Sequence, residues 1–514
     1  MTQAPSKKAR CVMVLGTSSG AGKSWLATAL CRYYARQGLK VAPFKAQNMS
    51  NNARVVGSTT GEGEIGSAQY FQALAARAEP DVRMNPLLLK PERDTHSQVV
   101  LLGRVDAALT AMPWRARSQH VWPAISAALD ALRFENDVVV IEGAGSPAEI
   151  NLMANDIVNL RIAAHAQAAC LLVTDIDRGG AFAHLYGTWA LLPAASQAQI
   201  KGFVLNKFRG DASLLAPAPQ MLQDKTGVPT VATLPLWRGH GLPEEDGVYD
   251  ATPTQGAGAK GVGAHGGSRC VAILAYPRMS NLDEFQPLKT MPGVRLHWVR
   301  SRADMPALQP QDWLILPGSK HTSSDLAWLR SQGLDAVVHQ HAEQGGAVLG
   351  VCGGLQMLGE ALVDPHGIEH AYLGNAPGLG LLPLVTVFAP DKTVQRTTVV
   401  FSEAVAVPCT SPWSALAGVS VTGYEIHHGQ TAQHAGLAAK GELAVPVLPH
   451  DLGWRNQRGN VLGVYVHGLF EDRAVQQALF GLEGLPPALD AVFDAMADYV
   501  EQHFAPGVLQ DLLA

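Results

Sequence analysis

Short apolar runs recur along the chain, and each is followed by a polar or glycine-rich turn and then by a segment of helical length. In the first half these runs are Cys11–Leu15, the run that starts at Val41, Asp137–Glu142, Ala169–Val173 and the run that starts at Gly202. Continuous apolar strands that alternate with helices are typical of a parallel sheet covered on both faces. The pattern therefore predicts an α/β fold with a doubly wound parallel sheet.

A second series of the same kind begins near residue 270, so we expect a second doubly wound domain. Its apolar runs include Val271–Tyr276, Trp313–Leu316, Ala347–Val351 and the run that starts at Val461. A chain of 514 residues is also too long for a single core. The predicted organisation is a first domain at 1–250, a Gly-, Ala- and Thr-rich linker at 251–268, a second domain at 269–474, and a helical segment at 475–514 that caps the second domain.

Composition and charge exclude several classes of protein. Hydrophobic residues make up 47% of the chain and charged residues 16%, as in a well-packed protein rather than a disordered one. A net charge of −5 gives no basic surface for nucleic acid, and no apolar run reaches the length of a membrane span. The six cysteines form no CxxC pair and no zinc spacing, which fits a reducing cytoplasm. We expect a cytoplasmic enzyme without nucleic-acid or membrane partners.

The first apolar strand runs into the glycine-rich segment GTSSGAGKS, residues 16–24, and then into a helix. Backbone N–H groups of such a loop cradle phosphates, the lysine reaches the outer phosphates, and the hydroxyl that follows can hold magnesium. The standard P-loop pattern has glycine where this chain has Thr17, so the loop is a variant; the alternative is an ordinary glycine-rich turn. The residues that we expect to bind ATP here are Thr17, Gly20, Gly22, Lys23 and Ser24.

Polar residues follow the strand that starts at Val41. Lys45 comes at its carboxyl end, where ligands bind in open parallel sheets, and we expect it to contact the nucleotide. Amide side chains then offer neutral donors and acceptors for a substrate rich in amides and carboxylates, although a solvated loop explains them equally well. The candidate substrate residues are Gln47, Asn48, Asn51, Asn52 and, in a later polar turn beside Lys90, Asp94.

Two further strand ends of the first domain carry candidate chemistry. Glu142 ends a buried strand, so its carboxylate can face the P-loop and bind Mg²⁺ together with Ser24. The alternative is a carboxylate that only caps the strand. Asn206 ends another strand and is placed to read the nucleotide base.

The second domain contains a cysteine at a sharp turn between a strand and a helix. Cys352 lies between glycines, after the strand Ala347–Val351 and before a predicted helix at Leu355–Leu362. Glycines allow the strained backbone of a nucleophile elbow, and the N-terminus of a helix stabilises a thiolate. A lone cysteine is more often only a buried core residue.

A histidine supplies a second element of this candidate site. His467 follows Cys352 by 115 residues and ends an apolar strand of the same predicted sheet. A thiolate nucleophile needs a neighbouring imidazole, so the pair predicts a catalytic Cys–His centre. By itself, His467 would more often be structural.

With both sites identified, the second domain resembles the class I glutamine amidotransferases, which have a flavodoxin-like fold. The matching segments are Leu316–Ser319, Gly350–Gly354 and Tyr465–Gly468. The resemblance implies that backbone N–H groups at Gly318 and Gly353 stabilise the oxyanion. The family's usual glutamate, two residues after the histidine, is replaced here by Leu469, which is similar to a divergent branch where cysteine and histidine act without it.

The first domain resembles dethiobiotin synthetase, a P-loop NTPase-like fold. Fused to such an amidotransferase, it is the plan of the cobyrinic acid amidating enzymes. The segments that carry this resemblance are 44–52, 90–94, 175–180 and 423–429. They resemble the branch that uses ATP, Mg²⁺ and glutamine to amidate four peripheral carboxylates of a cobalt corrinoid, adenosylcobyrinic a,c-diamide. The resemblance also implies a sheltered route for ammonia between the two sites.

Three alternatives remain at this point. The a,c-diamide synthase of the same family has a different segment where this chain has Ala46–Met49. A cell-wall precursor amidator would share the chemistry but not the acceptor. A non-catalytic ATP switch of the partitioning-protein type shares the variant P-loop but leaves Cys352 and His467 unexplained.

Overall fold

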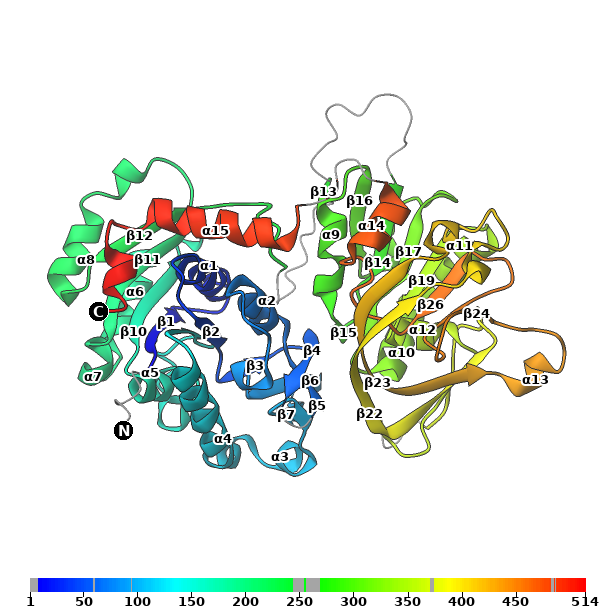
Figure 1. Ribbon diagram of the computed structural model, residues 1–514, viewed down its shortest axis with the longest axis horizontal. Coiled ribbons are helices and arrows are strands. Elements are labelled where there is room, and N and C mark those ends of the chain that lie inside the picture. The colour runs from blue at the N-terminus through cyan, green and yellow to red at the C-terminus, as the bar shows by residue number, and fades with distance from the viewer. Residues whose placement is uncertain are drawn as a thin grey trace, which may run out of the picture. The chain divides into compact units, whose positions relative to one another are not determined.

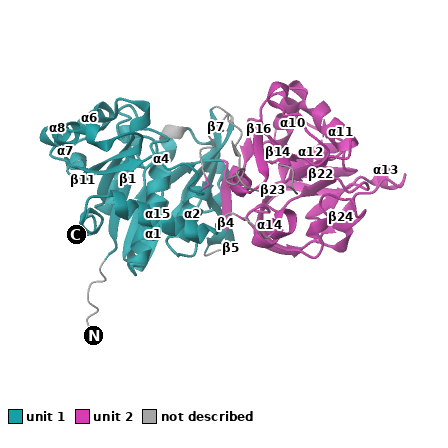
Figure 2. Ribbon diagram, turned by 90° about the horizontal axis from the view of Figure 1, so that it is seen from above, with its two compact units in different colours: residues 1–50, 56–242, 487–514 teal, residues 51–55, 243–486 magenta. Residues whose placement is uncertain are grey.

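The computed structural model describes residues 8–58, 61–93, 95–243, 254–255, 269–369, 374–481, 485 and 487–514. The chain divides into two compact units (Figure 2). Unit 1 comprises Met1–Ser50, Val56–Leu242 and Pro487–Ala514, and unit 2 comprises Asn51–Val55 and Pro243–Pro486. The short segment Asn51–Val55 thus belongs to unit 2, although the residues on both sides of it in the sequence belong to unit 1.

Unit 1 is built on a six-stranded parallel sheet with the order β12-β11-β10-β1-β9-β2 (Figure 1). Its strands are β1 Arg10–Gly16, β2 Val41–Phe44, β9 Val138–Glu142, β10 Ala169–Asp175, β11 Ile200–Phe208 and β12 Thr230–Pro235. Alternate residues of β1 enter different hydrophobic clusters: Val12 and Val14 enter one, and Met13 and Leu15 enter the other. The sheet is therefore buried on both faces, which confirms the doubly wound prediction.

Helices cover both faces of this sheet. The α-helices of unit 1 are α1 Lys23–Arg36, α2 Ser67–Ala75, α3 Ala107–Ala111, α4 Trp114–Glu135, α5 Leu160–Ala166, α6 Ala181–Ala190, α7 Ala194–Gln197, α8 Ala218–Thr226, α15 Leu489–His503 and α16 Val508–Asp511. Short 3-10 helices are η1 Val82–Met84, η2 Met153–Asn155, η3 Ile176–Arg178 and η4 Ala212–Leu215. None of the described helices of the chain combines the length and apolarity that a membrane crossing requires.

The C-terminal helices differ from the prediction that 475–514 caps the second domain. Pro487–Ala514 belongs to unit 1, where α15 lies beside α1 (Figure 1). The apolar face of α15, which includes Phe493 and Met496, enters the same cluster as α1, and the buried Arg32 of α1 forms ion pairs with Asp490 and Asp494. The sequence predicted helical structure here, but the apolar face of a helix does not by itself indicate which apolar surface it will cover.

Between β2 and α4, the chain of unit 1 adds small sheets. Strands β3 Gln47–Met49, β6 Leu87–Arg93, β7 His96–Leu101 and β8 Arg104–Val105 form one of them, and β4 Ala53–Ser58 pairs with β5 Gly61–Gly66. The polar segment after Lys45 is therefore partly strand, whereas the sequence predicted a loop.

Unit 2 contains an eight-stranded sheet with the order β13-β16-β14-β17-β19-β26-β25-β24. Its strands are β13 Thr254–Gln255, β14 Arg269–Leu274, β16 Val294–Val299, β17 Trp313–Leu316, β19 Ala347–Val351, β24 Val445–Leu448, β25 Gly453–Arg455 and β26 Val461–Val464. The strands from β16 to β26 in this order are parallel, and antiparallel strands flank them. The helices of unit 2 are η5 Leu282–Phe285, α9 Gln286–Thr290, η6 Arg302–Asp304, α10 Thr322–Ser331, α11 Leu334–Glu343, α12 Gly353–Leu358, η7 Glu403–Ala406, η8 Ser414–Leu416, α13 Ala435–Ala438 and α14 Arg473–Phe480.

Unit 2 also contains a smaller sheet that the sequence did not predict. Its order is β21-β20-β22-β23, and its strands are β20 Ala361–Val363, β21 Ala376–Pro377, β22 Leu384–Val400 and β23 Ser420–Gln433. A further pair joins β15 Met279–Ser280 to β18 Gly318–Ser319. The helix predicted at Leu355–Leu362 instead ends at Leu358, because Gly359 caps it and the chain turns into β20. The predicted linker lies outside the described residues except for Thr254 and Gln255.

Candidate functional site

The P-loop of unit 1 connects β1 to α1, and two of its glycines have positive φ. Gly22 has φ 100° and caps α1, and a Cβ at this position would lie 2.0 Å from Nδ2 of Asn206. Gly20 has φ 70°. Lys23 extends back over the loop and donates to the carbonyl oxygens of Ser18 and Gly145, each at 3.0 Å. The positive φ angles of Gly20 and Gly22 favour glycine at both positions, and at Gly22 the close approach of the Asn206 side chain also leaves no space for a Cβ.

Neighbouring strands hold the two ends of the loop. The hydroxyl of Thr17 donates to Thr174 at the end of β10, 3.0 Å away. The side chain of Asn206, at the end of β11, donates to the carbonyl of Ala21 at 2.9 Å. The structure thus places Asn206 against the P-loop, with its side chain bonded to the loop backbone.

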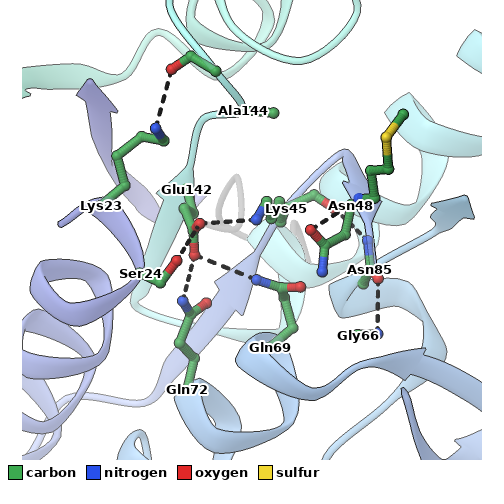
Figure 3. Close-up of polar contacts among 12 residues, drawn as sticks. Lys23, Ser24, Lys45, Asn48, Gly66, Gln69, Gln72, Asn85, Glu142 and Ala144 are labelled. Atoms are coloured by element: carbon green, nitrogen blue, oxygen red, sulfur yellow. Dashed lines mark hydrogen bonds and ion pairs between the residues drawn. The ribbon is translucent and has the colours of Figure 1, made fainter. Parts of the chain in front are cut away.

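Glu142 is the centre of a buried polar cluster in unit 1, drawn in Figure 3. Its Oε1 accepts hydrogen bonds from the hydroxyl of Ser24 at 2.7 Å and from Nζ of Lys45 at 2.9 Å. Its Oε2 accepts from Nε2 of Gln72 at 2.6 Å and from Nε2 of Gln69 at 3.4 Å. Ser24, Lys45 and Glu142 were predicted as site residues from the sequence, but the two glutamines of α2 were not. The sequence of a helix does not indicate which strand end its amide side chains will contact.

The surroundings of Glu142 decide its charge. Burial raises the pKa of this carboxyl, but the Lys45 ammonium and the hydrogen bonds from Lys45, Ser24 and Gln72 outweigh burial, so the pKa is lowered overall. An ionised carboxylate beside a hydroxyl offers the hard oxygen ligands that Mg²⁺ prefers. Among the described residues, no group of three or more His, Cys, Asp or Glu could hold a metal ion.

The predicted substrate residues are divided between the two units. Gln47 and Asn48 lie on β3 in unit 1, whereas Asn51 and Asn52 belong to unit 2. Oδ1 of Asn52 accepts a hydrogen bond from the backbone N–H of Leu282 at 2.9 Å, which gives this side chain a structural role. Asp94 lies outside the described residues.

In unit 2, Cys352 has the backbone of a nucleophile elbow. Its φ is 50° and its ψ is −106°, a region that L-residues rarely occupy, and its N–H donates to Val464 of β26 at 2.8 Å. A Cβ on the following Gly354 would lie 1.9 Å from the carbonyl oxygen of Leu316. The tight turn therefore depends on glycine, as the sequence predicted.

His467 contacts a carboxylate that the sequence analysis missed. Its Nδ1 lies 3.0 Å from Oε1 of Glu284, and Oε2 of the same carboxylate accepts the N–H of Gly468 at 3.0 Å. His467 is 1% exposed and Glu284 is 0% exposed. Leu469, at the position of the usual glutamate, is a buried core residue. The acid thus comes from η5, far upstream in the chain, and no spacing rule could have connected it to His467.

The pairing changes the protonation of the imidazole. Burial lowers the pKa of His467, but the Glu284 carboxylate and the neighbouring Cys352 raise it more, to about 10. The ring is consequently an imidazolium at neutral pH. A cation beside a cysteine stabilises its thiolate, which is the nucleophilic form.

The two predicted oxyanion residues, Gly318 and Gly353, lie in turns that meet close to His467. A Cβ on Gly318 would lie 3.0 Å from Cε1 of His467, and a Cβ on Gly353 would lie 2.7 Å from the backbone nitrogen of Ser319, the residue after Gly318. The turn after β17 and the N-terminus of α12 therefore meet beside His467 and Cys352. This arrangement has the parts of a cysteine-dependent acyl-transfer site.

Comparison with known families assigns both units. A CobQ/CobB/MinD/ParA nucleotide binding domain matches residues 12–239, and a CobB/CobQ-like glutamine amidotransferase domain matches residues 270–475. Among solved structures, PurLQS from Thermotoga maritima is 16% identical, with a TM-score of 0.30 over 45% of this chain and 99% of its own, which is too weak a likeness for any argument.

Several relatives match almost the whole chain. Cobyric acid synthase from Polaromonas sp. (strain JS666 / ATCC BAA-500) is 68% identical, with 98% of this chain and 99% of its own covered. Cobyric acid synthases from Albidiferax ferrireducens and Variovorax paradoxus are each 69% identical with the same coverage. With its nucleotide-binding and amidotransferase domains, the chain belongs to the cobyric acid synthase family, the glutamine-dependent amidating ligases of cobalamin biosynthesis.

Proposed function

We propose that this enzyme uses ATP and glutamine to amidate four peripheral carboxylates of adenosylcobyrinic a,c-diamide, giving adenosylcobyric acid. The observation that carries the proposal is the match to cobyric acid synthases over 98% of the chain, which includes both candidate sites. The cysteines of the described residues are all unpaired, and this supports a cytoplasmic location.

Glutamine would be hydrolysed in unit 2. The thiolate of Cys352 attacks the side-chain amide carbon, and the N–H groups at Gly318 and Gly353 stabilise the negative charge on the carbonyl oxygen. His467 donates its proton to the departing nitrogen, so ammonia leaves and a thioester remains on Cys352. Water, deprotonated by His467, then attacks the thioester carbon, releases glutamate and restores the thiolate beside the imidazolium. Glu284 keeps the imidazole oriented through both proton transfers.

The corrinoid carboxylate would be activated in unit 1. Lys23 and Lys45 would bind the phosphates of ATP, and the P-loop amides would orient the γ-phosphoryl group for attack by a substrate carboxylate. Magnesium held by Ser24 and Glu142 would supply charge neutralisation for the transferring phosphoryl group. The products of this step are ADP and an acyl phosphate. Ammonia then attacks the acyl carbon, phosphate leaves, and an amide forms.

The decisive experiment is mass spectrometry of cobyrinic a,c-diamide after incubation with the protein, ATP, magnesium and glutamine. We expect four successive amidation products. In a Cys352→Ala variant supplied with glutamine, the products should disappear. Loss of the nucleophile should lower the rate of glutamine hydrolysis by at least about 10³-fold. The products should return when ammonium replaces glutamine.

Other results would identify another function. Amidated products from cobyrinic acid but none from its a,c-diamide would assign the enzyme to the earlier pair of amidations. An active glutaminase without any corrinoid product would overturn the acceptor and leave the two-step chemistry. A protein that releases no glutamate would contradict the amidation chemistry as a whole.

A further inference from the structure

Arg54 is a buried cation in unit 2 that the mechanism above does not use. It lies in the segment Asn51–Val55 and is 3% exposed. Its Nε donates to Oδ2 of Asp283 at 2.9 Å, and its Nη2 contacts the same oxygen. Its Nη1 donates to Oε2 of Glu471 at 2.8 Å, and Nη2 also contacts Oε1 of that carboxylate. One guanidinium thus bridges two carboxylates from distant parts of the chain.

Both carboxylates lie next to parts of the glutamine site. Asp283 immediately precedes Glu284, whose side chain contacts His467. Glu471 follows His467 by four residues. The bridge therefore connects the backbone that carries the acid to the backbone that carries the imidazole, within one unit.

The backbone of the same segment is tied to the start of η5. Oδ1 of Asn52 accepts the N–H of Leu282 at 2.9 Å, and the N–H of Ala53 donates to Oδ1 of Asn281 at 3.0 Å. Asn281 itself has a left-handed φ of 55° at the cap of η5. Together with Arg54, these bonds determine the position of the turn that presents Glu284.

An aromatic side chain makes a second connection from Arg54 to His467. The guanidinium carbon of Arg54 lies 5.1 Å from the centre of the Tyr424 ring. The Tyr424 ring stacks on His467 with a centroid distance of 5.2 Å and an interplanar angle of 19°. The backbones of Tyr424 and His467 also pair through two hydrogen bonds. Arg54, Tyr424 and His467 consequently form one packed column.

Arg54 also interacts electrostatically with the carboxylates around it. The carboxylates of Asp283 and Glu284 are buried, and Glu471, whose side chain is 23% exposed, shares the Arg54 guanidinium with Asp283. Burial raises the pKa of Glu471, whereas Arg54 lowers it and Asp283 and Glu284 raise it further. Among the described residues, the titratable groups that interact with these carboxylates include His467, Tyr424 and Tyr276, and Cys352 interacts in turn with His467 and Tyr276. Without the guanidinium, the pKa of Glu471 would rise further.

We propose that Arg54 is a positioning residue of the glutamine-hydrolysing site: by holding Asp283 and Glu471, it keeps Glu284 aligned on His467. The inference rests on the proposed hydrolysis of glutamine by Cys352 and His467. It also means that the amidotransferase domain matched at 270–475 is incomplete by itself, because part of its support comes from residues 51–55.

The test is a double-mutant cycle on glutamate release from glutamine, with Arg54→Met and Glu284→Gln made singly and together in the full chain. Outer-shell partners of a functional group typically contribute about 10–100-fold, so Arg54→Met should lower kcat/KM by that factor. In the Glu284→Gln background, the same change should cost less than about threefold, because residues that act as a unit are not additive.

The pH profile separates positioning from packing. In Arg54→Met, the acidic limb of kcat/KM should move to higher pH, because the pKa of Glu471 rises when its carboxylate loses the guanidinium. Arg54→Lys keeps the charge, so it should recover the wild-type acidic limb while kcat stays reduced. This variant also tests the proposal if Arg54→Met fails to fold.

Arg455→Lys is the matched control. Arg455 is similarly buried in unit 2, but it donates to the backbone carbonyls of Ala404 and Asn456. The pH profile of the Arg455→Lys variant should therefore be that of the wild type. Additive effects of Arg54→Met and Glu284→Gln, or an unchanged acidic limb in Arg54→Met, would overturn the proposal and leave Arg54 a purely structural residue. Wild-type protein that releases no glutamate would contradict the proposed function instead, and the inference with it.

Discussion

Each unit of the protein contains a buried ion pair at its candidate site, and the two pairs are built for opposite purposes. In unit 1, the Lys45 ammonium holds the Glu142 carboxylate ionised and lowers its pKa. In unit 2, the Glu284 carboxylate holds the His467 imidazole protonated and raises its pKa to about 10. The first pair keeps the Glu142 carboxylate charged, as binding of a cation requires. The second keeps the His467 imidazole charged, which stabilises a neighbouring thiolate.

The two pairs also differ in how the chain assembles them. Glu142 and Lys45 lie at the ends of neighbouring parallel strands and Ser24 lies in the first turn of the helix after β1, which is where such sheets bind ligands. The two glutamines of α2 complete the cluster. The Glu284–His467 pair joins a 3-10 turn to the end of β26, and Arg54 supports it from a third region of the sequence. Fold topology therefore explains the first site, whereas the second depends on side chains that no topological rule brings together.

The largest effect in this comparison is expected from Lys45→Gln. Loss of the ammonium removes a preorganised charge from the phosphates, and amidation with either ammonium or glutamine should fall by about 10²–10³-fold. Glutamate release by unit 2 should continue. Corrinoid mass spectrometry and a glutamate assay on the same sample measure both, and equal losses in the two assays would mean that the sites are not separable in this way.

Glu284→Gln tests the second pair and should have an intermediate effect. The change keeps the shape but removes the charge that raises the pKa of His467, so the imidazolium should lose its proton at lower pH than in the wild type. The basic limb of kcat/KM for glutamate release should move to lower pH, and the rate should fall by about 10–100-fold. Ammonium-dependent amidation is the internal control, and a basic limb that stays in place would show that another group protonates the site.

The smallest effect is expected from Gln72→Leu, which removes one neutral donor from Glu142. The pKa of Glu142 should rise, and the KM for ATP with magnesium should increase by about tenfold, at the low end for outer-shell partners. Gln69→Leu is the matched comparison, since its donor lies 3.4 Å from the carboxylate rather than 2.6 Å. A larger effect at Gln69 than at Gln72 would contradict the geometry of Figure 3.

The pattern of apolar runs was enough to predict two parallel-sheet units and the strand ends that carry Lys45, Glu142, Cys352 and His467. Strand periodicity and glycine turns are local properties, so they can be read from neighbouring residues. The same reasoning predicted a nucleophile elbow, and the positive φ of Cys352 confirms that backbone conformation.

Tertiary structure alone decided which distant side chains complete each site. The sequence indicated a helical C-terminus but not that α15 packs on α1, since an apolar stripe fits any apolar surface of the right shape. Likewise, the sequence showed that Leu469 stands where the usual glutamate would be, but it offered no reason to choose Glu284 among the acidic residues of the chain. Local patterns determine secondary structure and strand ends, whereas contacts between remote residues, such as those of Arg54 and Glu284, follow only from packing in three dimensions.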